Sequence, residues 1–171
     1  KGGFGEDAVG VIQEELHDRA LLGGEGKLHA VLEELERLVV EAEGTGLDVR
    51  GGSLAVMGTF GNPVVLAPVE EGGRWNGVSV TGPKRSEVQG VVVRNAEFGF
   101  AVESGALELR DAEIDNAHRA ALYVRNASVD VQWSTIQDSK NIGIWATQSA
   151  TVLVDGANLD NNRIALVAGD E

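Results

Sequence analysis

A five-residue motif recurs at a constant step of 22 residues through the second half of the chain. A fixed internal period is the signature of a repeat protein, in which each repeat stacks on its neighbours. The period therefore constrains the fold more than any other feature. Its copies are Phe98–Val102, Ala120–Val124, Ile142–Ala146 and Ile164–Ala168, preceded by a weaker copy at Asn76–Val80.

Two further apolar columns follow the same period. One contains Leu107/Leu109, Val129/Val131 and Val152/Val154, and the other contains Val93, Ile114, Ile136 and Leu159. Each repeat thus carries three short apolar segments bounded by Gly, Asn, Asp or Ser, which is typical of strands separated by turns. Three strands per repeat predict an all-β fold, a right-handed parallel β-helix of about five coils of about 22 residues.

Alternation along the strands predicts which side chains lie inside. Successive residues of a strand point to opposite sides. We therefore expect an inner apolar ladder of Phe100, Leu122, Ile144 and Leu166. The small residues between them are then expected on the outer side, and these are Gly99, Ala121, Gly143 and Ala165.

The first part of the chain lacks this period. We expect residues 1–45 to form a partly helical N-terminal cap and residues 46–171 to form the β-helix. Apolar residues at helical spacing favour a helix, and these are Leu28, Val31, Leu32, Leu35, Leu38 and Val39. The alternative is that strand begins near residue 38, so residues 27–45 stay open between helix and first coil.

The charge balance restricts the partners. The chain has 27 acidic and 14 basic residues, which gives a net charge of −13. Such a surface repels phosphate backbones and anionic lipids. No apolar run approaches the roughly 18 residues of a membrane span. We therefore expect no nucleic-acid partner and no membrane insertion, and the absence of Cys excludes disulfides and thiolate metal sites.

Three short segments carry a family resemblance. They are Gly58-Thr59, Asn62-Pro63-Val64-Val65-Leu66 and Trp75-Asn76-Gly77-Val78. Through them, and over roughly residues 47–168, the chain resembles right-handed parallel β-helix repeat proteins of the pectate-lyase-like superfold, bacterial cell-surface type. The resemblance implies an extracellular or cell-surface location. It says little about activity, because this superfold hosts lyases, hydrolases, adhesins and inert stalks.

A polar column follows the third apolar column, one residue per repeat. It consists of Asn95, Asn116, Asp138 and Asn161. The resemblance implies a structural ladder of stacked side chains at a tight turn, where Asn and Asp tolerate left-handed geometry. The alternative is a metal or sugar site.

The acidic residues do not form a recognisable catalytic motif. Glycoside hydrolysis needs two carboxylates flanking the bond, and no such pair can be assigned. A lyase-like calcium site needs clustered carboxylates and a nearby base. Arg110 and Arg125 could serve as the base, but the available acids fall on different columns. These acids are Asp111, Asp115, Asp130, Asp155 and Asp160. We therefore expect no catalytic residue, no metal and no cofactor, with calcium as the alternative.

Tyr123 and Trp145 are predicted to point outward one coil apart. Two such rings offer a platform for a sugar, or a surface covered by protein. The predicted function is a non-catalytic β-helix scaffold or surface-exposed structural module of a secreted protein. The alternatives are a carbohydrate-binding module and a polysaccharide lyase or hydrolase-like domain. The expected partners are a second copy in a dimer, the rest of a longer parent chain, or a polysaccharide.

Overall fold

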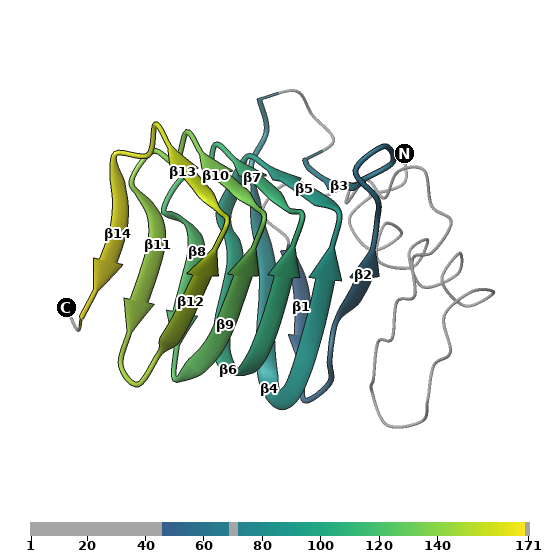
Figure 1. Cartoon of the computed structure of the whole chain (residues 1–171), viewed down its shortest axis with the longest axis vertical. Helices are drawn as coiled ribbons and strands as arrows, with labels where there is room; N and C mark the ends of the chain where they lie inside the picture. Colours follow the sequence, from purple (N-terminus) through teal and green to yellow (C-terminus); the bar gives the residue numbers. More distant parts are fainter. Residues whose placement is uncertain (1–45, 69–71, 170–171) are drawn as a thin grey trace, which may run out of the picture.

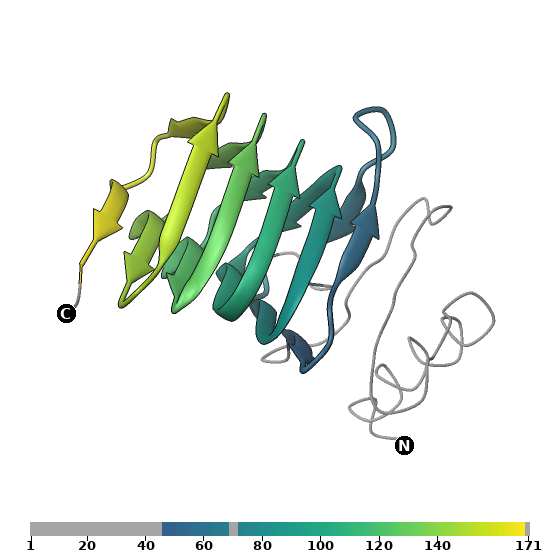
Figure 2. The ribbon, with the colours of Figure 1, turned by 60° about the horizontal axis from the view of Figure 1, so that its bottom comes forward.

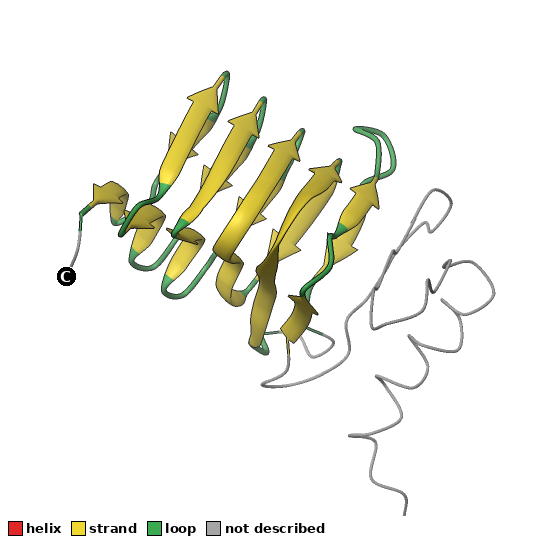
Figure 3. Ribbon diagram, turned by 90° about the horizontal axis from the view of Figure 1, so that it is seen from below, coloured by secondary structure: helices red, strands yellow, loops and turns green. Residues whose placement is uncertain are grey.

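The structure, a computed structural model, describes residues 46–68 and 72–169. Within these ranges the chain forms fourteen β-strands and no helix (Figure 3). The strands wind into a parallel β-solenoid of about four turns, seen from two sides in Figures 1 and 2. This confirms the parallel β-helix that the repeat predicts. The predicted cap, residues 1–45, lies outside the described residues.

Three faces run along the solenoid, each built of parallel strands from successive coils. Face A contains β1 (Gly46–Arg50), the first part of β4 (Trp75–Gln89), the first part of β6 (Ala96–Arg110), β8 (Ala120–Arg125), β11 (Ile142–Thr147) and β14 (Ile164–Ala168). Face B contains β2 (Ala55–Met57), the second parts of β4 and β6, β9 (Ala127–Gln132) and β12 (Thr151–Asp155). Face C contains β3 (Val64–Leu66), β5 (Val91–Arg94), β7 (Glu113–Asp115), β10 (Thr135–Gln137) and β13 (Asn158–Asp160).

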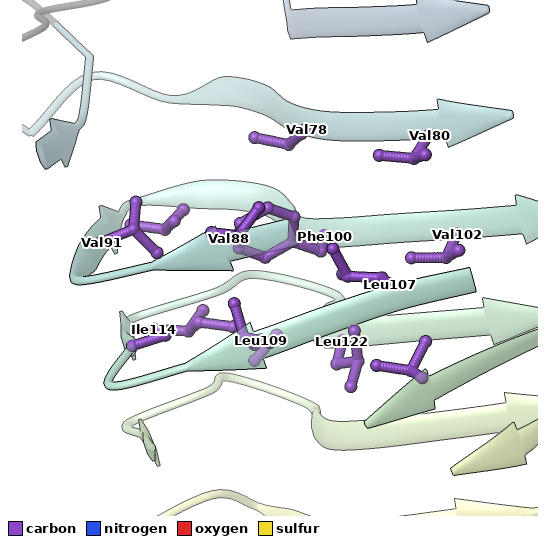
Figure 4. Close-up of a cluster of buried hydrophobic side chains, with 14 of the residues drawn as sticks. Val78, Val80, Val88, Val91, Phe100, Val102, Leu107, Leu109, Ile114 and Leu122 are labelled. Atoms are coloured by element: carbon purple, nitrogen blue, oxygen red, sulfur yellow. The ribbon is translucent and has the colours of Figure 1, made fainter. Parts of the chain in front are cut away.

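The register between coils reproduces the sequence period. Phe100 pairs with Leu122, Leu122 with Ile144, and Ile144 with Leu166, a step of 22 residues each time. Phe100, Leu122 and Ile144 are fully buried in the apolar core between the faces. Figure 4 shows Phe100 and Leu122 inside the coils with apolar side chains from the other faces, such as Leu109 and Ile114. The inner ladder is therefore the one predicted, except that Leu166 in the last coil is half exposed.

In three of the four coils the small residue, Gly99, Ala121 or Gly143, is buried, which corrects the expectation that this column lies on the outer side, whereas Ala165 in the last coil is exposed. Phe98 pairs with Gly77, and Phe100 pairs with the next residue, Val78, so Gly99 is an extra residue in a bulge of β6. The bulge turns this position toward the core, where Ala121 of the next coil is fully buried. A Cβ on Gly99 would lie 2.5 Å from Cγ2 of Ile114 on face C. Small residues are therefore needed for close packing at this bend.

Each corner of the triangle contains a column of residues with positive φ. At the corner between faces C and A the column is Asn95, Asn116, Asp138 and Asn161, with φ of 50–56°. Between faces A and B it is Gly105, Asn126 and Gln148, and between faces B and C it is Gly90, Asp111, Trp133 and Gly156. The left-handed conformation lets the chain change direction within one residue. All three corners therefore turn through a residue in this conformation.

Candidate functional site

An aromatic row lies on the outer side of face A. Tyr123 of β8 and Trp145 of β11 are register partners, and their ring centroids are 5.1 Å apart at an interplanar angle of 64°. Phe98 of β6 extends the row, with its ring centroid 5.5 Å from that of Tyr123. All three side chains are partly buried. The structure thus brings the two predicted residues together and adds a third.

Phe98 could not be placed from alternation alone. Strict alternation puts Phe98 and Phe100 on the same side, whereas the bulge at Gly99 leaves Phe98 outside and Phe100 inside. The guanidinium carbon of Arg119 lies 5.2 Å from the Phe98 ring centroid, a cation–π contact. A glycine between two aromatic residues was the signal in the sequence, because glycine in a strand often marks a bulge.

The aromatic row borders an open groove of about 710 Å³ that runs along face A. Its walls include the three rings, the backbone of the first coil at Gly46, and polar side chains from three strands and from the turn before β8. These polar residues are Asp48, Asn76, Ser79, Glu103 and Arg119. Aromatic surface combined with several hydrogen-bonding groups is the usual make-up of a site for a small polar ligand.

Arg119 is tied to the corner beside the groove. Its Nε lies 3.9 Å from Oε1 of Glu97, and Nδ1 of His118 lies 3.3 Å from Oε2 of the same carboxylate. Glu97 therefore lies close to both side chains of the turn that enters β8. Because a carboxylate partly neutralises Arg119, the groove offers little net positive charge to an anionic ligand.

The predicted polar column forms hydrogen bonds between coils in two separate pairs. Nδ2 of Asn116 donates to Oδ1 of Asn95 at 2.7 Å. Nδ2 of Asn161 donates to Oδ1 of Asp138. Between the pairs, Oδ1 of Asn116 is buried and accepts no hydrogen bond from any described residue. The column thus holds the corner turns together along the solenoid, with a break where Asp138 replaces asparagine.

Face B carries a network of charges on its outer side. Glu108 of β6 accepts a hydrogen bond from Arg85 of β4 in the preceding coil, and its Oε1 lies 2.6 Å from Nη2 of Arg110. The hydrogen bond from Arg85, with the positive charges of Arg85 and Arg110, lowers the pKa of Glu108 below the ordinary value despite partial burial. These charged groups therefore bind one another rather than standing free for proton transfer.

The acids considered for calcium are dispersed. Asp130 lies on face B, Asp115 and Asp160 lie on face C, and Asp111 occupies a corner. Within residues 46–68 and 72–169, no three His, Cys, Asp or Glu side chains are grouped closely enough to hold a metal ion. In the same ranges, no helix has the length and hydropathy required to span a membrane.

Comparisons with protein-family models, with curated proteins and with solved structures gave no match to this chain.

Proposed function

We propose that this chain is a non-catalytic β-solenoid scaffold, a structural module of a secreted or cell-surface protein. The proposal includes kinship with the pectate-lyase-like superfold. That kinship rests on the sequence motifs around Gly58 and Trp75. In the fold, the Trp75 side chain is buried and its Nε1 donates to the carbonyl oxygen of Arg94 at 2.8 Å, so this motif anchors one coil to the next.

The proposal rests on polar side chains that form hydrogen bonds and ion pairs from one coil to the next. Glu108 is held by Arg85 and Arg110, Asn116 is bonded to Asn95, and Arg110 also donates to Oε1 of Gln132 at 3.2 Å. Glu108, a side chain of a type that can catalyse acid–base reactions, thus connects two successive coils through Arg85. Such networks rigidify a repeat array, in which each coil contacts only its neighbours.

An activity assay tests the scaffold proposal. The purified chain is incubated with pectate, polygalacturonate and alginate, with calcium and with a chelator. We expect no release of reducing or unsaturated ends above a buffer blank. Steady product formation that scales with protein concentration would refute the proposal.

A second candidate function is favoured by the aromatic row. We propose as the alternative that the groove beside Phe98, Tyr123 and Trp145 binds a carbohydrate. Ring faces stack on the apolar face of a sugar, and Asp48, Ser79 and Glu103 supply hydrogen-bonding groups. The carboxylates favour a neutral or cationic glycan over a polyuronate, which they would repel.

A glycan array with matched variants tests this alternative. Trp145→Ala removes a ring from the row, whereas Trp133→Asn removes an exposed ring at a corner turn outside the groove. Asparagine is chosen there because it tolerates positive φ. Binding lost in the first variant and kept in the second would support a glycan site. Binding that is absent from the wild type, or lost equally in both variants, would exclude it.

A further inference from the structure

The groove on face A exists because one outer column changes from small to aromatic residues. The register aligns Asp48, Ser79, Ala101, Tyr123 and Trp145 in this column, one residue in each coil. Ser79 and Ala101 form a low floor in two coils, and the rings rise from the next two, where β8 and β11 lie side by side (Figure 1). The resulting step fits a ligand with a flat apolar face and polar groups around it.

Strand β6 is irregular on both sides of this floor. The bulge at Gly99 leaves Phe98 on the outer side. A second register shift follows Val102: Val80 pairs with Val102, but Thr81 pairs with Ser104, so Glu103 is an extra residue. Bulges re-aim side chains and are frequent beside functional sites. The two bulges supply Phe98 and Glu103 to the groove walls, so β6 departs from regular pairing where those walls form.

Glu103 is a groove charge with no opposite charge bound to it. The other charged side chains of the groove are already balanced. Asp48 accepts a hydrogen bond from Nε of Arg50 at 2.6 Å, and Arg119 lies near the carboxylate of Glu97. The side chain of Glu103 is exposed and forms no hydrogen bond or ion pair with a described residue. The groove therefore retains one negative charge that a ligand can neutralise.

The basic residue at the neighbouring position of the next coil is bound elsewhere. Arg125 follows Val124, the register partner of Val102. Its Nε donates to Oε1 of Gln148, one coil further along, at 3.0 Å. The net charge of −13 adds a long-range attraction for cations. The local and the overall charge thus favour the same sign of ligand.

The position of Glu103 matches the size of a sugar. It lies two residues beyond Ala101 along β6, which is about 6.6 Å at the usual rise of a strand and close to the width of one sugar ring. A sugar on the floor against Tyr123 would thus bring a ring substituent beside the carboxylate. A hydrogen bond between an ammonium group and a carboxylate is roughly twice as strong as one between neutral groups.

We propose that the groove binds a glycan whose sugars carry free amino groups, and that Glu103 selects the ammonium group. This inference rests on the carbohydrate site proposed above as the alternative function, and it names the ligand class of that site. Phe98 and Tyr123 contact the apolar faces of the sugars, and the Ser79 hydroxyl bonds to the polar edge. Glu103 repels a uronate and gains no charge pairing from an N-acetylated sugar.

Titration calorimetry of the full chain with three oligosaccharides of equal length tests the proposal. They are oligomers of glucosamine, N-acetylglucosamine and galacturonate, used at a weakly acid pH that protonates the amines. The glucosamine oligomer should bind about tenfold more tightly than the N-acetylated one, and the galacturonate oligomer should not bind.

A matched pair of variants isolates the contribution of Glu103. Glu103→Gln keeps the shape of the side chain and removes its charge. It should weaken binding of the glucosamine oligomer about tenfold and leave binding of the N-acetylglucosamine oligomer unchanged. Glu87→Gln removes the same charge from an exposed position on face B, outside the groove, and should change neither affinity.

The failure of this inference can be told apart from the failure of the carbohydrate site. No binding of any oligosaccharide would refute the site, and the inference with it. Equal binding of the glucosamine and N-acetylglucosamine oligomers, or an unchanged preference in Glu103→Gln, would refute only the selection of the ammonium group. Equal losses in Glu103→Gln and Glu87→Gln would indicate general attraction of a polycation to an acidic protein, which also overturns the inference.

An oligolysine of matched charge separates an amino sugar from a basic peptide, since both carry ammonium groups. Trp145→Ala should abolish binding of the glucosamine oligomer, whereas oligolysine should bind weakly and independently of Trp145. Should Trp145→Ala fail to fold in a thermal melt, Ala101→Gln fills the floor without removing a ring and should have the same effect. Oligolysine that binds as tightly as the glucosamine oligomer, and needs the same residues, would assign the groove to a basic peptide and overturn the glycan.

Discussion

Replacing Asp138 with asparagine should stabilise the protein, because it supplies a hydrogen-bond donor where the corner column is broken. Oδ1 of Asn116 is buried without a donor among the described residues, and the side chain one coil further along is the carboxylate of Asp138. An ionised carboxylate can only accept hydrogen bonds. An asparagine at this position can donate to Asn116 through Nδ2 and still accept from Asn161 through Oδ1.

The expected gain follows from the groups involved. A new hydrogen bond between neutral groups contributes about 0.5–1.5 kcal/mol, and relief of a buried unsatisfied acceptor adds about 1 kcal/mol. The substitution also has a cost: the hydrogen bond that Asn161 donates to residue 138 no longer ends on a charged carboxylate, which roughly halves its strength. The net expectation is about 1 kcal/mol of added stability, or a rise in Tm of about 2–4 °C for a domain of this size.

Urea unfolding at neutral pH, followed by circular dichroism, measures the difference directly. Asp111→Asn is the matched control: it removes the same charge at another corner with φ of 50°, where Oδ2 accepts only a long 3.4 Å contact from Gln89. The control should change stability little, which separates the new hydrogen bond from the reduction in net charge. If Asp138→Asn is neutral or destabilising, or if the two variants gain equally, the ladder argument is wrong.

Three further predictions concern the core, the bulge and the charge network. Ile144→Asp buries an unpaired charge in the inner ladder and should cost about 4 kcal/mol or more in urea unfolding, whereas Asp130→Asn on the outer side of face B should change little; equal effects would contradict the inward and outward assignment. Gly99→Ala should cost about 1–3 kcal/mol in the same assay, because its Cβ would meet Ile114. Since Arg85 lowers the pKa of Glu108 in the folded state, that pairing contributes stability above the ordinary pKa of glutamate, near 4.3, and loses it as pH falls through the lowered value. Glu108→Gln should therefore flatten the loss of stability between about pH 6 and pH 3, and an unchanged acid profile would count against the network.

The stacking of coils could be predicted from the sequence because it depends on a period. The inner ladder of Phe100, Leu122 and Ile144 repeats both its spacing and its apolar character, and the structure keeps the same register. Asn95 and Asn116 signalled one corner because one residue type recurs there. The other corners use unlike residues, such as Asp111 and Trp133, for the same backbone conformation, so residue identity carried no signal.

The aromatic row could not be predicted in full, because it depends on a local irregularity of one strand that does not alter the sequence period. The bulge at Gly99 reverses the side on which Phe98 emerges, and Phe98 completes the aromatic row beside Tyr123. Alternation predicts directions only in regular strands, so it placed Ala121 on the wrong side for the same reason. The break in the corner column likewise has no signal in the sequence spacing, because it consists of an acceptor atom of Asn116 that receives no hydrogen bond from a described residue.

The bonding of each coil only to its neighbours determines how the solenoid would respond to mechanical load. A force that pulls on the chain beyond β14 acts first on β14, which among the described strands pairs only with β11. The hydrogen bonds of that coil are loaded one after another, as in unzipping, while the coils below carry no extra strain. Each coil of 22 residues that peels away lengthens the chain by about 70 Å. The molecule would therefore yield in a series of small, nearly equal extensions.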